Sequence, residues 1–191
     1  MNDKNTIDIP QVDIVLWGAT GFVGRLLAGY LWAKYGASGK ITSALGGQDR
    51  SELESLRNDL KADDRLPLFA GNAFDAQFLD VITQKTRVIV STVGPYAQYG
   101  SKLVAACTAN GTDYCDLSGE TQWMHRMINA HQEDAQVSGA RIVHSCGFDS
   151  IPSDMGVLFL QTRAEERFGH PMEQVKMRVK SIRGGASGGT V

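Results

Sequence analysis

The sequence has little net charge, few cysteines and no long apolar run. Its 19 basic and 21 acidic residues leave a formal net charge of −2, which gives no reason to expect a nucleic-acid or anionic-membrane partner. No stretch approaches the ~18 consecutive apolar residues of a membrane-spanning helix. The polar start, Met1 to Thr6, lacks the basic and apolar regions of a signal peptide. We therefore expect neither a membrane span nor a signal peptide.

The three cysteines are too few and too widely spaced for a disulfide framework. Cys107, Cys115 and Cys146 lie in apolar surroundings and are odd in number. This usage predicts buried free thiols in a reducing compartment, and hence a cytoplasmic protein. No Cys/His spacing typical of zinc occurs, so no metal is expected.

Strand patterns alternate with helical patterns six times along the chain. The first strand, Val12 to Trp17, is almost continuously apolar, as in a strand covered on both faces. Five more strands are predicted at 41–45, 67–70, 88–92, 113–117 and 141–146, with helical stripes between them and a last helix starting near Pro152. The short connections predict an α/β fold, a doubly wound parallel sheet of the Rossmann type with helices on both faces.

Two details of the helices can also be predicted. The helix after the first strand carries an apolar stripe, which consists of Phe22, Val23, Leu26, Leu27, Tyr30 and Leu31. The next helix begins with Ser51 and Glu54 in the pattern of a capping box, with Ser51 as the cap.

The composition and the pattern of apolar residues change at about Glu173. Residues 175–182 alternate apolar and polar side chains, as a half-exposed strand does, and residues 183–191 are rich in glycine. We expect residues 1–172 to form one domain and residues 173–191 to begin a second α+β domain, truncated here, of a longer protein. A natural flexible tail is the alternative.

The segment GATGFVG places three glycines at every third position, between the first strand and the helix after it. Gly18 permits a sharp turn, Gly21 lets a pyrophosphate approach the backbone, and Gly24 lets the helix pack closely. Free amides and the positive end of the helix then face the phosphates. A tight turn without a ligand is the alternative, and the lack of a following Gly-Lys-Ser/Thr excludes a P-loop. We predict a dinucleotide site made of Gly18, Ala19, Thr20, Gly21, Phe22, Val23 and Gly24.

The end of the second strand bears on the choice of dinucleotide. An acidic residue there commonly binds the ribose hydroxyls of NAD, but the segment ALGGQDR puts no acid at the strand end itself. Arg50 could pair with a 2′-phosphate, whereas Asp49 could bind ribose hydroxyls instead. We predict NADP, with NAD as the alternative.

Other candidates follow from the rule that ligands of open α/β sheets lie beyond the carboxyl ends of the strands. Val93, Gly94 and Pro95 bring backbone close to the expected path of the cofactor. Asp75 either reaches the adenine or caps its helix. For each candidate tyrosine, packing with a satisfied hydroxyl is the alternative to a chemical role. The candidate proton donors nearest the expected nicotinamide are Tyr96, Tyr99, Glu120 and Asp149.

Three segments together resemble the saccharopine dehydrogenase-like oxidoreductases, and within them the branch that includes the trans-acting enoyl reductases. They are GATGFVGRLLAGYL, VIVSTVGPYAQYGSKLVAACTANGTDYCDLSGE and RIVHSCGFDSIPSDMGVL. The resemblance implies an NAD(P)-binding domain and a second domain, beginning at RGGASGGTV, that completes the substrate site and often mediates pairing. Relatives often have Ala-Gly-Arg after the second strand. This chain has Gly46-Gly47-Gln48, so Arg50 would have to substitute for the missing arginine.

These observations give a functional hypothesis. The protein transfers hydride from NADP or NAD to a small or lipid-like substrate, as in enoyl reduction, and pairs into a homodimer through its second domain. The fragment alone is expected to bind cofactor without turnover. A redox-inactive dinucleotide-binding module that acts with a partner is the alternative. An epimerase-type enzyme is disfavoured, because its Tyr-x-x-x-Lys pair occurs only as Tyr30 and Lys34, on the first helix.

Overall fold

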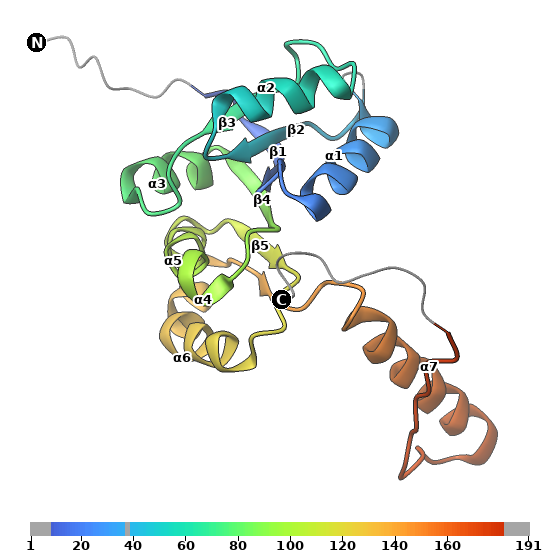
Figure 1. The fold of residues 1–191 in the computed structure, drawn as a ribbon. Coiled ribbons are helices and arrows are strands. Elements are labelled where there is room, and N and C mark those ends of the chain that lie inside the picture. Colours follow the sequence, from blue (N-terminus) through green and yellow to red (C-terminus); the bar gives the residue numbers. More distant parts are fainter. Residues whose placement is uncertain (1–8, 37–38, 182–191) are drawn as a thin grey trace, which may run out of the picture.

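A computed structural model describes residues 9–36 and 39–181 of the chain. Six parallel strands form one sheet in the order β3-β2-β1-β4-β5-β6 (Figure 1). They are β1 (Val12–Trp17), β2 (Ser43–Gly47), β3 (Leu68–Ala70), β4 (Thr86–Ser91), β5 (Asp113–Asp116) and β6 (Ile142–Val143). The chain order of the strands reverses between β1 and β4, which places a crevice at their carboxyl ends. The predicted doubly wound parallel sheet is confirmed.

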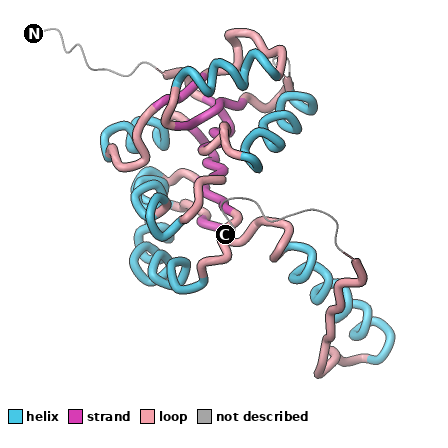
Figure 2. The backbone as a smooth tube through the Cα atoms, viewed as in Figure 1, coloured by secondary structure: helices cyan, strands magenta, loops and turns pink. Residues whose placement is uncertain are grey.

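Helices cover the sheet on two faces, and the strands run between them (Figure 2). The helices are α1 (Phe22–Tyr35), α2 (Arg50–Asp59), α3 (Ala76–Gln84), α4 (Tyr96–Tyr99), α5 (Ser101–Asn110), α6 (Thr121–Ser138) and α7 (Ile151–Phe168). Leu16 packs in a core with α1 and α2, whereas Val15 and Trp17 pack in a second core with α3, α5 and α6. Alternate residues of β1 therefore serve opposite faces, which explains its continuous apolar sequence.

Helix α7 stands apart from the sheet (Figure 1). Of its 18 residues only Ala164 is buried, and apolar side chains such as Met155, Leu158 and Phe159 are exposed. None of the described helices is both long and apolar enough to cross a bilayer.

The predicted apolar stripe of α1 is buried only in part, since Leu31 is buried and Val23 and Leu27 are half-buried. Phe22, Leu26 and Tyr30 are exposed, and the buried side of the helix consists of Gly24, Ala28 and Leu31. Gly24 and Ala28 allow α1 to approach the loop after β1 closely, and Phe22, Leu26 and Tyr30 lie on the outer side of the helix.

The predicted cap of α2 is wrong. Asp49 caps the helix, because its Oδ1 accepts hydrogen bonds from the amides of Ser51 at 2.7 Å and Glu52 at 3.2 Å. The Ser51 hydroxyl itself donates to Asp49 at 2.6 Å. The helix therefore begins earlier than the Ser51 to Glu54 pattern indicates.

Two further predictions fail in the described chain. Residues 173–181 form no strand, since no neighbouring strand is there to pair with them, and residues 182–191 lie outside the described residues. The domain division at residue 172 stays a prediction. Only Cys107 is buried, because it lies in α5 beneath the sheet; Cys115 is half-buried and Cys146, beyond the short edge strand β6, is exposed.

Candidate functional site

A cleft of about 440 Å³ lies at the carboxyl ends of β1, β2 and β4. Its walls come from the glycine loop after β1, the end of β2 and the loop after β4, which meet at the reversal of strand order. Of the predicted cofactor residues it contains Gly18, Thr20, Gly21, Val93 and Gly94. Gly18 and Val93 therefore meet in this cleft although they are more than 70 positions apart in the chain.

Two of the three loop glycines are required by the packing of the protein itself. Gly18 has a φ of 88°, and a Cβ there would lie 2.6 Å from Cγ2 of Val93. A Cβ at Gly24 would lie 2.1 Å from the carbonyl oxygen of Gly18. The predicted roles of both residues, a sharp turn and a close helix approach, agree with this geometry.

Gly21 is different, because no part of the protein requires it. Its φ is −71°, and the nearest atom to an added Cβ would be the Gly18 carbonyl oxygen at 3.5 Å, an ordinary contact. The residue lines the cleft. The space beside it is therefore open on the side where a ligand would lie.

The start of α1 is the only one of the first three helix starts without a side-chain cap among the described residues. Asp49 caps α2, and Asp75 caps α3 through the amides of Gln77 at 3.0 Å and Phe78 at 3.2 Å. Gly21 at the start of α1 offers no side chain for this. The first amides of α1 are therefore free to bind an anion at the cleft.

The other predicted cofactor residues lie outside the cleft lining. Ala19 and Gly24 are buried beneath the loop, Phe22 points to solvent and Val23 is half-buried. Pro95 lies directly before α4. Asp75 caps α3, which is the second of the two roles that its sequence position allows. A role of Asp75 at the adenine stays a prediction.

Acidic side chains stand at the end of β2. Gln48, Asp49 and Glu52 line the cleft, whereas Arg50 does not. The Nε of Arg50 instead donates to Glu54 at 3.0 Å on the exposed side of α2. The hydrogen bond from the Ser51 hydroxyl, with the amides of Glu52 and Ser51, lowers the pKa of Asp49, so this wall carries a negative charge at neutral pH.

Tyr96 is a packing residue. Its side chain is buried, its hydroxyl donates to the carbonyl of Ser91 at 3.1 Å, and the amide of Leu117 donates to that hydroxyl at 3.4 Å. Burial raises the pKa of Tyr96 well above its ordinary value. The candidate role of Tyr96 as a proton donor has no support in this geometry.

Glu120 holds the start of α4. Its carboxylate accepts hydrogen bonds from the amides of Tyr96 at 2.6 Å and Ala97 at 2.9 Å. Both oxygens are thus engaged with backbone, which gives the residue a structural task that the sequence did not indicate.

Tyr99 is the one candidate proton donor that lines the cleft. Its ring packs against Phe74, with 5.6 Å between the ring centroids. Asp149 is exposed and does not line the cleft. Tyr30 and Lys34 pair at 2.8 Å on the surface of α1, and neither lines the cleft.

Sequence reasoning missed a buried pair at the ends of β5 and β6. The Nδ1 of His144 lies 2.7 Å from Oδ2 of Asp116, and both side chains are largely shielded from solvent. The sequence signal that could have pointed to this pair is Asp116, a charged residue within a predicted strand. Within residues 9–36 and 39–181, no group of three or more His, Cys, Asp or Glu side chains is arranged to hold a metal.

The strand order and the glycine loop define a Rossmann-type α/β domain, and solved structures share this fold. Saccharopine dehydrogenase (L-Glu forming) from Saccharomyces cerevisiae, in its apo form, matches with a TM-score of 0.61 at 16% identity, over 81% of this chain and 31% of that chain. Pen from Bacillus thuringiensis matches with a TM-score of 0.56 at 10% identity, over 83% of this chain and 58% of that chain.

Sequence comparison identifies closer relatives. The chain is 43% identical over 182 residues to a candidate trans-acting enoyl reductase of Mycobacterium tuberculosis. The aligned region covers 95% of this chain and 43% of that protein. It is 42% identical over 165 residues to the trans-acting enoyl reductase of Mycobacterium leprae, over 85% of this chain and 38% of that protein. No family model matches. The chain is thus a homologue of the trans-acting enoyl reductases, as its motifs predict, and spans less than half the length of these relatives.

Proposed function

We propose that this chain is the dinucleotide-binding part of an oxidoreductase that reduces a carbon–carbon double bond in a small or lipid-like substrate. The observation that carries the proposal is the open space beside Gly21, which faces the cleft and which no protein atom fills. The enoyl reductase relatives support the type of reaction. Pairing through a second domain and a cytoplasmic location stay predictions.

The cleft residues fit a nicotinamide dinucleotide. The uncapped amides of α1 and the hydroxyl of Thr20 would hold the pyrophosphate beside Gly21. When bound, the reduced nicotinamide supplies a hydride for one carbon of the double bond, and the other carbon takes a proton. Tyr99, the candidate that lines the cleft, is the proton donor that we propose.

The end of β2 favours NAD over the predicted NADP. Asp49 and Glu52 line the cleft, and two carboxylates there would repel a 2′-phosphate while binding ribose hydroxyls. Arg50, on which the NADP prediction depends, pairs with Glu54 instead. We therefore propose NAD as the preferred cofactor.

Calorimetric titration of the chain with NADH and NADPH tests the proposal. We expect binding by the wild type and a loss of at least about tenfold, ~1.4 kcal/mol, in Gly21→Ala, because the added methyl group occupies the space of the pyrophosphate. Gly156→Ala is the matched control, since an added Cβ there meets no atom within 4 Å, just as one at Gly21 makes only an ordinary contact, and Gly156 lies in α7, outside the cleft lining. Equal affinity in both variants and the wild type would mean that the cleft does not hold the pyrophosphate.

Two substitutions at the end of β2 test the cofactor preference. Asp49→Asn keeps a good helix cap but removes the charge, so the ratio of NADH to NADPH affinity should fall. Arg50→Gln should leave both affinities unchanged. A loss confined to NADPH in Arg50→Gln would restore the predicted NADP preference.

A redox-inactive binding module is the second candidate, because Tyr96 and Glu120 are engaged in structural hydrogen bonds. The full-length protein, followed by nicotinamide absorbance with a panel of enoyl thioesters, separates the two functions. Oxidation of the cofactor with any of them supports the enzyme. Binding without oxidation across the panel supports the module.

A further inference from the structure

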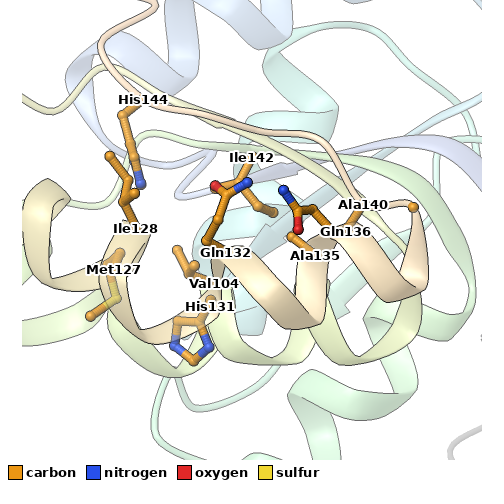
Figure 3. Close-up of a pocket in the computed structure, with 11 residues that line it drawn as sticks. Val104, Met127, Ile128, His131, Gln132, Ala135, Gln136, Ala140, Ile142 and His144 are labelled. Carbon is orange, nitrogen blue, oxygen red and sulfur yellow. The ribbon is translucent and has the colours of Figure 1, made fainter.

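Strand β6 forms an edge of the sheet, and its two residues face opposite sides. Ile142 lines a pocket of about 390 Å³ together with α6 (Figure 3), whereas Val143 is 50% exposed. On the neighbouring strand β5, Tyr114 packs in the core with Trp123 of α6. Cys115, the next residue, pairs in register with Val143. The Cys115 side chain therefore lies on the face of β5 and β6 that is turned away from α6.

The chain bends after β6 and brings Cys146 to the same place. Ser145, directly before it, has a φ of 61°, the left-handed conformation that favours glycine. The amide of Cys146 donates to the carbonyl of Asp116 at 2.6 Å. The thiol of Cys146 donates to the carbonyl of Val143 at 3.5 Å. Cys146 is thus fixed both to β5 and to the residue that pairs with Cys115.

The two thiols also interact with each other through a hydrogen bond between Cys115 and Cys146. A segment that is hydrogen-bonded to a strand lies about 5 Å from it, which is within the Cα separation that a disulfide spans. Within the described ranges, no group of three His, Cys, Asp or Glu side chains is arranged to hold a metal. The pair is therefore placed for a bond between its own sulfur atoms.

The surroundings of the two thiols give them different roles. Cys146 is exposed, whereas Cys115 is half-buried. Burial, and then the neighbouring Cys146, raise the pKa of Cys115 to about 11, so this thiol stays protonated at neutral pH. Burial raises the pKa of Cys146 as well, so its own reaction with an oxidant is slow. Because only Cys146 is open to solvent, it reacts first, and Cys115 is in contact to close the disulfide.

We propose that Cys115 and Cys146 form a reversible disulfide when the protein meets a peroxide. In the first step the Cys146 sulfur attacks hydrogen peroxide. An S–O bond forms, the O–O bond breaks, and the leaving hydroxide takes the thiol proton and becomes water. In the second step the Cys115 sulfur attacks the sulfenic acid at Cys146. The S–S bond forms, the S–O bond breaks, and the hydroxide leaves as water with the proton of Cys115, so the two electrons that the thiols lose reduce the peroxide.

The disulfide ties β5 to the segment that leads to Asp149 and α7. In the described chain β6 pairs with β5 at two register positions, so few hydrogen bonds hold this edge. A covalent bond that closes a loop of about 30 residues restricts the unfolded chain and should raise the Tm by roughly 5 °C or more. Neither cysteine lines the dinucleotide cleft, so the inference does not depend on the proposed function.

Treatment of the folded, reduced chain with hydrogen peroxide tests the pair. Remaining thiols are blocked with iodoacetamide, and the chain is digested with chymotrypsin, which cleaves after Tyr114 and so separates Cys107 from Cys115. Mass spectrometry should find peptides joined through Cys115 and Cys146, and dithiothreitol should release them. The same treatment in urea should give a mixture that also contains links to Cys107. Thermal unfolding of the oxidised and reduced chains measures the shift in Tm.

Three alanine variants serve as controls. Cys115→Ala and Cys146→Ala should lose both the link and the rise in Tm, whereas Cys107→Ala, the matched control, should keep both. In Cys115→Ala the sulfenic acid at Cys146 has no thiol to resolve it, so dimedone should label it more strongly than in the wild type. The proposal is overturned if no link between Cys115 and Cys146 forms in the folded wild-type chain, if Cys107 enters the link as often as Cys115, or if the linked chain melts no higher than the reduced chain.

Discussion

At the residue scale, the loop after β1 assigns different tasks to glycines three positions apart. A Cβ at Gly24 would lie 2.1 Å from a backbone oxygen, and backbone cannot move aside as a flexible side chain can. We expect Gly24→Ala to lower the free energy of unfolding by about 3 kcal/mol or more, and Gly21→Ala to change it by less than about 1 kcal/mol. Urea denaturation measures both, and equal destabilisation by the two variants would contradict the assignment.

The three thiols should react in the order of their exposure. Cys146 is exposed, Cys115 is half-buried and Cys107 is buried. Burial raises the pKa of Cys115 to about 11, so roughly one in a thousand of its thiols is ionised at pH 8. Alkylation of the native protein, followed by mass spectrometry, should label Cys146 first and Cys107 last, and should accelerate at Cys115 as the pH approaches 11. Early labelling of Cys107 would contradict the packing of α5.

At the scale of the elements, the short helix α4 depends on a carboxylate distant in the chain. Glu120 accepts from the amides of Tyr96 and Ala97 across 24 and 23 positions. We expect Glu120→Ala to cost about 1–2 kcal/mol of stability, because two amides lose their partner, and Glu120→Gln to cost less, because one acceptor oxygen remains. Thermal unfolding of the two variants gives the order. A stable Glu120→Ala would show that water caps α4 equally well.

At the scale of the whole molecule, aspartates at the amino ends of the strands join them. Asp13 of β1 accepts from the amide and hydroxyl of Thr42 and from Arg87, and these hydrogen bonds lower its pKa below the ordinary 3.8. Asp113 of β5 pairs with Arg141, just before β6, and Arg141 lowers its pKa in the same way. Both carboxylates tie one strand to its neighbours.

A lowered pKa in the folded state means that the unfolded chain binds more protons in acid. The stabilisation from Asp13 and Asp113 is therefore complete above their ordinary pKa and is lost as the pH falls through their lowered values. We expect the free energy of unfolding to be level between pH 7 and about 5 with respect to these groups and to decline below about 4. Asp13→Asn should flatten this decline, and an unchanged acid profile in the variant would contradict the assignment.

Short-range patterns explain why much of the molecule can be predicted from sequence. The apolar run of β1 and the spacing of Gly18, Gly21 and Gly24 each reflect a requirement that acts within a few residues. The burial of α1 was predicted only in part, because the close approach at Gly24 requires small side chains, which an apolar stripe does not indicate. The pair of Asp116 and His144 joins residues 28 positions apart, and no local pattern shows such a contact.

The central place of β1 in the sheet has a consequence for synthesis. Val12–Trp17 leaves the ribosome before the other five strands of this sheet, yet one of its two ladders is made with Thr86–Ser91. A nascent chain can complete β1, β2 and β3 while the other edge of β1 still lacks its neighbour, and pairing over so long a separation is slow. The pace of translation between Gly71 and Lys85 therefore sets how long that bare apolar edge is open to chaperones or to other nascent chains.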